Sequence, residues 1–279
     1  MTEATPRTDA QRPPRIAVWP VAPAAVLGRV LADVLGGEVV AVESHQAAGA
    51  LVSGEADLAL IPTLSVLRTP EAFSLVPGVG LVGERSPSRT LVLAGGLGDI
   101  ETVAFDPRWG QEALLTQLLL REHYDLKPTF SPVPDGTPLA EQLAAHGAAL
   151  VSPDTQIPDG AVVLDLGQEW TDLTTRPMVW GLVASGPGVL TPEAALALAE
   201  AVADAGDPTG EGTYQLSLTG LGYDGLEALS DHLFYTGTLG AIPELPFVPV
   251  TDEEPEADAL DVLLEVPADP DASPEARTN

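Results

Sequence analysis

The chain has 279 residues, 45% of them hydrophobic, which suffices for one large domain or two lobes of roughly 100–130 residues each. Its net charge is −29 and Lys127 is its only lysine. Nucleic acids and anionic membranes both require a basic face, so these partners are not expected. The absence of cysteine excludes disulfides, thiolate metal sites and cysteine nucleophiles.

Both ends of the chain differ in composition from its middle. Residues 1–14 are polar and proline-rich without the apolar stretch of a signal peptide, so we expect a disordered arm and a cytoplasmic protein. Residues 251–279 are strongly acidic and predict a disordered tail. No run reaches the ~18 apolar residues that a membrane-spanning helix needs.

The first half alternates short apolar strands with amphipathic helices, a pattern typical of α/β folds with parallel strands. Ser44 is expected to cap the second helix, which stops at Gly54. We expect strands at 15–19, 38–42, 57–62 and 89–95. The first helix, over 23–35, should bury the face that carries Val26, Leu27, Val30, Leu31, Val34 and Leu35.

A second unit of the same kind follows the glycine-rich segment 95–101, which we expect to cross between lobes. Thr191 and Pro192 predict the start of a later helix, and Asp224 with Glu227 forms a predicted capping box for another. Within this unit the pattern predicts helices over 110–124 and 138–146 and strands near "TVAFD", "LKPTF", "AALVS" and "AVVLD". Residues 178–184 are expected to form an apolar strand that returns to the first lobe.

Two α/β lobes joined by two crossings make a clamshell, whose default ligand site is the central cleft between the lobes. We assign residues 15–96 and 182–250 to lobe 1 and residues 97–181 to lobe 2.

The sequence does not contain a common cofactor-binding motif in the structural context that the motif requires. "GVGLVG" at 78–83 matches G-x-G-x-x-G, but a turn and a strand follow it where a phosphate-binding helix would have to start. No G-K-[ST] or G-x-S-x-G is present, and the four histidines lack metal-ligand spacing. We therefore predict no cofactor and no metal.

The segment "VVLDLGQEWTDLTTRPMVWGLVA", residues 162–184, holds two of the four tryptophans around a cluster of charged residues. Asp165 or Glu169 is positioned to cap a short helix, and Gly167 permits a close turn. We interpret the segment mainly as packing at a lobe junction. The alternative is a role in the cleft for Arg176 or Trp180.

"LDLGQEW" followed by "LTTRPMVWGLVA" resembles the signature region of the futalosine-pathway menaquinone-biosynthesis family, whose type member is chorismate dehydratase. "ADLALIPTLSVL", "LVPGVGLVGERSPSRTLVL" and "VAFDPRWGQEALLTQLLLREHY" are similar to further blocks of that family, so the resemblance spans about residues 15–240. It implies a two-lobed fold of the type II periplasmic-binding-protein kind. It also implies a lyase that removes water from chorismate in the interlobe cleft.

The chain departs from the family at two places that matter for this chemistry. In the family turn Y-x-N-x-x-P the asparagine is implicated in catalysis, whereas "VWPVAP" here has Pro20 at that position. The family holds a carboxylate with Ser and Thr hydroxyls where this chain has "DPRWGQEA". Arg108 either replaces those hydroxyls by pairing with the carboxylate or forms a surface ion pair with Glu112.

These comparisons predict one ligand-binding set and leave the catalytic residues unassigned. The set is expected to converge in one pocket and to bind a small anionic or aromatic carboxylate, in a monomer or homodimer. Three functions stay open: a chorismate dehydratase-like lyase, a non-catalytic carboxylate-binding relative, and a structural protein with a closed cleft. The predicted ligand-binding residues are Thr90, Arg89, Arg108, Gln111, Arg176 and Trp180.

Overall fold

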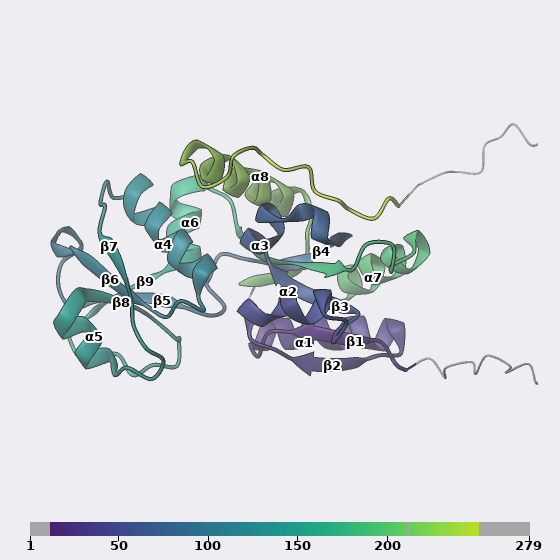
Figure 1. Cartoon of the computed structure of the whole chain (residues 1–279), viewed down its shortest axis with the longest axis horizontal. Helices are drawn as coiled ribbons and strands as arrows, with labels where there is room; N and C mark the ends of the chain where they lie inside the picture. Colours follow the sequence, from purple (N-terminus) through teal and green to yellow (C-terminus); the bar gives the residue numbers. More distant parts are fainter. Residues whose placement is uncertain (1–11, 211, 251–279) are drawn as a thin grey trace, which may run out of the picture.

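The computed structural model describes residues 12–210 and 212–250, and these build two β-sheets that lie side by side, each with its own helices (Figure 1). The whole of the expected acidic tail and residues 1–11 of the expected arm therefore lie outside the described residues. Of the expected arm, residues 12–14 are described, and Arg12 forms an ion pair with Asp57 at 2.9 Å.

The first lobe contains a six-stranded mixed sheet with the order β11-β4-β10-β3-β1-β2. Strand β1 pairs in parallel with β2 and β3, whereas β10 runs antiparallel to both β3 and β4. Its strands are β1 (Arg15–Val18), β2 (Glu38–Ala41), β3 (Leu58–Pro62), β4 (Ser74–Gly83), β10 (Met178–Ser185) and β11 (Tyr214–Ser217).

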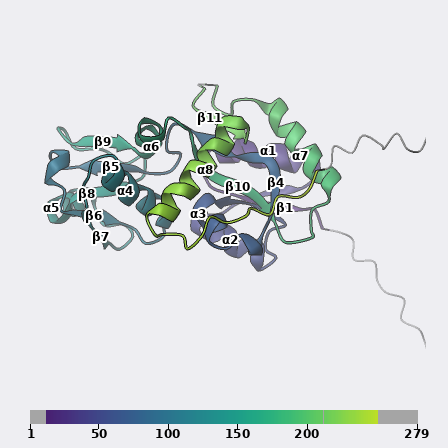
Figure 2. The same cartoon turned by 90° about the horizontal axis from the view of Figure 1, so that it is seen from above.

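Five helices cover this sheet. Helices α1 and α7 pack against each other on one face, and α2 and α3 lie on the other (Figure 2). The helices are α1 (Ala22–Leu35), α2 (Ser44–Val52), α3 (Thr63–Arg68), α7 (Pro192–Ala205) and α8 (Gly220–Tyr235).

The second lobe contains a five-stranded sheet with the order β7-β6-β8-β5-β9. Strands β7, β6 and β8 are parallel, so their carboxyl ends meet at one edge of the sheet. The strands are β5 (Thr90–Leu93), β6 (Thr102–Phe105), β7 (Thr129–Pro132), β8 (Gly147–Val151) and β9 (Val162–Asp165). The helices are α4 (Gly110–Glu122), α5 (Leu139–His146) and α6 (Leu166–Thr174).

The chain crosses between the lobes at residues 84–89 and again after α6, at residues 175–177. The expected crossing at 95–101 is wrong, because β5 and β6 belong to the same sheet. Lobe 1 is expected to include residues up to 96, and lobe 2 residues up to 181. The sheets divide the chain differently, because β5 lies in the second lobe and all of β10 lies in the first. An apolar strand fits either sheet equally well, since its sequence pattern does not specify its partner.

Some local predictions are confirmed and others are wrong. Thr191 caps α7, where its hydroxyl accepts a hydrogen bond from the Ala194 amide at 3.3 Å. Ser44 is the first residue of α2 and makes no capping bond. Asp224 lies inside α8, because that helix begins five residues earlier than the capping-box pattern indicates. On α1, Val34 is exposed.

A large hydrophobic core extends through both lobes, and a smaller cluster around Val92 and Leu143 lies within the second lobe. Buried members of the large core include Leu60 of β3, Leu91 of β5 and Leu118 of α4. Trp170 and Trp180, the two tryptophans of the 162–184 segment, are both fully buried in this core. Within the described residues, none of the helices combines the length and apolar character that crossing a bilayer requires.

Candidate ligand-binding site

A cavity of about 600 Å³ lies between the two lobes. The first lobe contributes residues 19–23 after β1, residues 43–44 at the start of α2, Thr209 and Tyr214. The remainder comes from the crossing segment, residues 86–89, and from the segment after β8, residues 152–154.

The first-lobe wall presents the turn that connects β1 to α1. Trp19 is buried and its indole N–H donates to the Leu60 carbonyl at 2.8 Å, which fixes the turn to the neighbouring strand. Pro20 follows it and is exposed in the cavity wall. Proline offers no side-chain donor or acceptor, so the turn meets a ligand only through its shape and its backbone.

Arg89 is the only arginine or lysine among the residues that line this cavity. Its guanidinium carbon lies 4.0 Å from the centre of the Trp109 ring, a cation–π contact that holds the charge in place. Burial lowers the pKa of Arg89, and the carboxylates of Glu112, Glu43 and Asp106 oppose that shift. The cavity thus contains a half-buried cation with an aromatic support.

Beside Arg89, the Ser88 hydroxyl donates to the buried carboxylate of Glu112 at 2.6 Å. Glu112 belongs to the first turn of α4, where the helix dipole favours a negative charge. This contact joins the crossing segment to the second lobe. It replaces the expected Arg108–Glu112 ion pair, since Arg108 pairs with Asp106 and Asp135.

The Asp-Leu-Gly segment 165–167 holds the same crossing in place. The Asp165 carboxylate caps α6 by accepting from the Gly167 and Gln168 amides, and it also accepts from the Ser86 amide at 3.0 Å. A Cβ atom at Gly167 would lie 2.5 Å from the Arg85 carbonyl carbon. Glycine is therefore needed here because the two backbones approach so closely.

The rest of the signature segment packs at the lobe junction. Glu169 accepts a hydrogen bond from the Tyr124 hydroxyl, which ties α6 to the end of α4. The Trp170 ring makes an edge contact with His232 of α8, with the centroids 5.6 Å apart. These contacts support the interpretation of the segment as packing between lobes.

The predicted ligand-binding residues do not all converge. Arg89 lines the interlobe cavity, whereas Thr90 pairs with Val151 and Asp165 inside the second sheet. Arg176 lies 3.3 Å from Asp224 of α8, in an ion pair outside the lining of this cavity. Their proposed roles as ligand contacts stay predictions, and Arg89 is the cation that the fold places in the cavity.

Two other predicted residues, Gln111 and Trp180, are joined by a hydrogen bond. The Gln111 side chain accepts from the Leu64 amide at 2.9 Å and donates to the Trp180 carbonyl at 2.8 Å. It thereby joins α4 of the second lobe to α3 and β10 of the first. The Trp180 ring is fully buried and is not part of the lining of the interlobe cavity.

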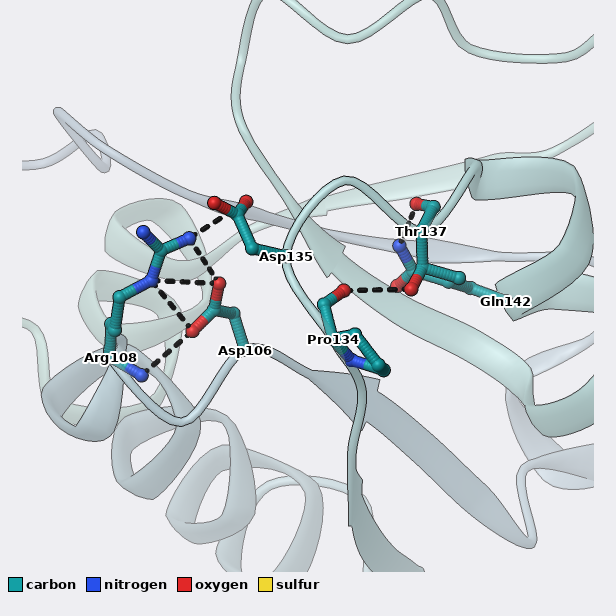
Figure 3. Close-up of polar contacts among 6 residues, drawn as sticks. All are labelled: Asp106, Arg108, Pro134, Asp135, Thr137 and Gln142. Atoms are coloured by element: carbon teal, nitrogen blue, oxygen red, sulfur yellow. Dashed lines mark hydrogen bonds and ion pairs between the residues drawn. The ribbon is translucent and has the colours of Figure 1, made fainter.

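Arg108 joins two loops of the second lobe, as Figure 3 shows. It contacts Asp106 at 2.5 Å and Asp135 at 2.7 Å. The hydrogen bonds and charge of Arg108 lower the pKa of the Asp106 carboxyl.

Sequence reasoning missed several polar residues of the cavity wall, namely Glu43, Ser44, Ser86, Ser88, Ser152 and Asp154. Ser152 and Asp154 follow a predicted strand, which is where ligand contacts gather in open α/β sheets. That signal was present in the sequence. The two serines of the crossing could not be found without knowing where the chain passes between lobes. Among the described residues, no group of three or more His, Asp or Glu is arranged to hold a metal ion.

Two α/β lobes with two crossings and a cleft between them define the type II fold of periplasmic solute-binding proteins. Several solved structures share it at low identity. Protein AF1704 from Archaeoglobus fulgidus aligns with a TM-score of 0.57 and 18% identity, covering 81% of this chain and 98% of that one. The alkanesulfonate-binding protein SsuA from Xanthomonas axonopodis pv. citri, bound to MOPS, aligns with a TM-score of 0.50 and 18% identity, covering 84% and 96%. An ABC transporter from Parabacteroides distasonis aligns with a TM-score of 0.52 and 15% identity, covering 86% of this chain and 99% of that one.

Residues 14–210 match the family described as menaquinone biosynthesis, and this chain belongs to that family. A search of curated proteins finds no significant match.

Proposed function

We propose that this chain is a menaquinone-pathway lyase of the chorismate dehydratase type, which binds a small aromatic-type carboxylate in its interlobe cleft. The observation that carries the proposal is Arg89, a half-buried cation held over Trp109 in the cavity wall. In a chain of charge −29, an anion needs such a local partner to overcome the repulsion of the surrounding carboxylates.

The proposed reaction removes a proton and a hydroxide from neighbouring carbons, so it needs a base and help for the departing hydroxyl. Glu43 of the first lobe and Asp154 of the second both line the cavity and are candidate bases. The serine hydroxyls of the crossing are candidate donors to the leaving oxygen. A cytoplasmic location belongs to the same proposal.

A second candidate function is carboxylate binding without turnover. The observation that favours it is Pro20, exposed in the cavity wall at the position where the resembled family has its catalytic asparagine. The side chain cannot donate or accept a hydrogen bond, so that contribution to catalysis must come from elsewhere or is absent.

One experiment separates the two candidates. Purified protein is titrated with chorismate while thermal stability and the absorbance of an aromatic product are followed together. Turnover supports the lyase, and stabilisation without turnover supports the binding relative. If chorismate gives neither signal, the chorismate proposal is wrong.

The role of Arg89 is tested by Arg89→Gln, with Arg29→Gln, at an exposed position of α1, as the matched control outside the cavity. A hydrogen bond to a charged group contributes about 1.5–3 kcal/mol, so Arg89→Gln should weaken chorismate binding about 10-fold to 150-fold. Arg29→Gln should bind like the unmodified chain. Equal effects of the two substitutions would remove Arg89 from the proposal.

A further inference from the structure

A second, smaller cavity of about 150 Å³ lies in the second lobe, at the carboxyl ends of its parallel strands. Its lining comes from the ends of three strands and from α5: Asp106 and Trp109 after β6, residues 133–137 after β7, residues 150–152 at the end of β8, Thr155, and Leu139 and Gln142 of α5. Ligands of open α/β sheets bind at this edge of the sheet. A cavity of about this volume accepts a benzene ring.

The charges around this cavity disfavour an anion. Asp106 and Asp135 belong to its lining, and no arginine or lysine does. Arg108 bridges the two carboxylates from outside that lining, which leaves the three side chains with one net negative charge (Figure 3). The carboxylate of a ligand is therefore directed to Arg89, in the neighbouring cavity.

Gln142 belongs to the lining of this cavity, and its side chain carries an acceptor without a partner in the part of the chain that the structure describes. Its amide nitrogen donates to the Thr137 carbonyl at 2.7 Å, and since a carbonyl only accepts, this bond fixes which end of the amide is nitrogen. The other atom, Oε1, is buried and has no hydrogen-bond partner among the described residues. A buried acceptor without a partner is destabilising, and a donor on a ligand would remove that cost.

The two cavities adjoin. Ser152 belongs to the lining of both, and the Trp109 ring lines the smaller cavity while carrying Arg89 of the larger one. A ligand that spans them places its acidic end at Arg89 and its other end beside Gln142.

We infer that the smaller cavity is a subsite for the hydroxyl-bearing part of the ligand, with Gln142 Oε1 as the acceptor that selects it. The part of this inference that concerns the substrate rests on the proposed function. It describes the substrate as a ring with a carboxylate at one end and a hydroxyl at the other. The subsite itself binds neutral hydroxyl donors without help from Arg89.

The test uses the full chain and a neutral probe pair of similar shape, catechol and 1,2-difluorobenzene. Only catechol can donate a hydrogen bond. In NMR titrations we expect catechol to shift the side-chain amide signals of Gln142 and to bind about fivefold to tenfold more tightly than its partner, the value of one hydrogen bond. Gln142→Met should abolish that difference, whereas Gln117→Met, at an exposed position of α4, should preserve it.

Equal binding of the two probes, or catechol shifts that avoid Gln142, would overturn the subsite. The titration of the unmodified chain decides this even if Gln142→Met fails to fold. Catechol binding without chorismate binding would keep the subsite and reject the proposed function. Chorismate binding through Arg89 without catechol binding would do the reverse.

Discussion

Gly167 has no side chain, and this allows its backbone to pack directly against the crossing segment at Arg85. A Cβ at this position would approach the Arg85 backbone to 2.5 Å, and backbone cannot move aside as a flexible side chain can. Gly167→Ala should therefore lower the free energy of unfolding by about 1–3 kcal/mol, the usual cost of overpacking. Urea titration followed by far-UV circular dichroism measures the change.

Gly49→Ala is the matched control in α2, because nothing lies within 4 Å of its added Cβ. There the substitution should raise the free energy of unfolding by about 0.5–1 kcal/mol, as alanine favours helix more than glycine does. If both variants shift stability in the same direction, the close approach at Gly167 has no energetic weight.

Asp106 should make stability depend on pH in the acid range. Arg108 lowers the pKa of this carboxyl below its ordinary value of 3.8, so the unfolded chain takes up the proton at a higher pH than the folded chain does. The stabilisation is complete above pH 3.8 and is lost as the pH falls through the lower pKa of the folded state. Asp106→Asn should thus be less stable than the unmodified chain at pH 6.

The difference in the free energy of unfolding between Asp106→Asn and the unmodified chain should shrink as the pH falls from 6 to 3. Urea unfolding at low protein concentration measures it, since the sequence isoelectric point is about 4.1. Glu141→Gln, on the exposed side of α5, serves as control. A difference that stays constant with pH would contradict the Asp106–Arg108 coupling.

At the scale of elements, periodicity predicted most helices and strands, and the failures have physical causes. Strand β4 was missed because Pro77, Gly78 and Gly80 interrupt its apolar pattern, yet its neighbours β10 and β11 keep it in the sheet. The N-cap of α6 was predictable from Asp165, but its second contact, with Ser86, depends on where the crossing runs.

The sequence predicted that arginines would bind the ligand, but it did not predict which arginine lies in the cavity. Scarce arginines pointed to Arg89, Arg108 and Arg176 together, and the sequence could not rank them. Their roles follow from neighbours that are distant in the chain: Trp109 for Arg89, Asp135 for Arg108 and Asp224 for Arg176. Tertiary contacts of this kind leave no local pattern.

Gln111 joins elements of both lobes, so we expect its loss to weaken the junction. Gln111→Met would keep the volume and leave the Leu64 amide and the Trp180 carbonyl buried without partners. Each such group costs roughly 1–3 kcal/mol. Gln117→Met, exposed on the same helix, should change the free energy of unfolding by less than about 0.5 kcal/mol. Chemical denaturation compares the two, and similar values would contradict a joining role for Gln111.

At the scale of the whole molecule, the continuous core distinguishes this chain from two domains that fold separately. The larger of two hydrophobic clusters contains buried residues of both sheets, whereas the smaller one lies within the second lobe. The crossings are held by Asp165 and by the Ser88–Glu112 contact. Lobes move and unfold independently when their interface is small and polar, and they do not when it is large and apolar. We therefore expect both lobes to unfold in a single transition.

Calorimetry should give a van't Hoff enthalpy equal to the calorimetric enthalpy, and tryptophan fluorescence and far-UV circular dichroism should share one midpoint. A ligand of the cleft at 100 times its Kd should stabilise the whole transition by about 2.7 kcal/mol, because both lobes bind it. Gln111→Met, which weakens the junction, should broaden or split the transition, whereas Gln117→Met should not. Two transitions in the unmodified chain, with only one of them shifted by ligand, would mean that the lobes are energetically independent and that the cleft forms only when they happen to close.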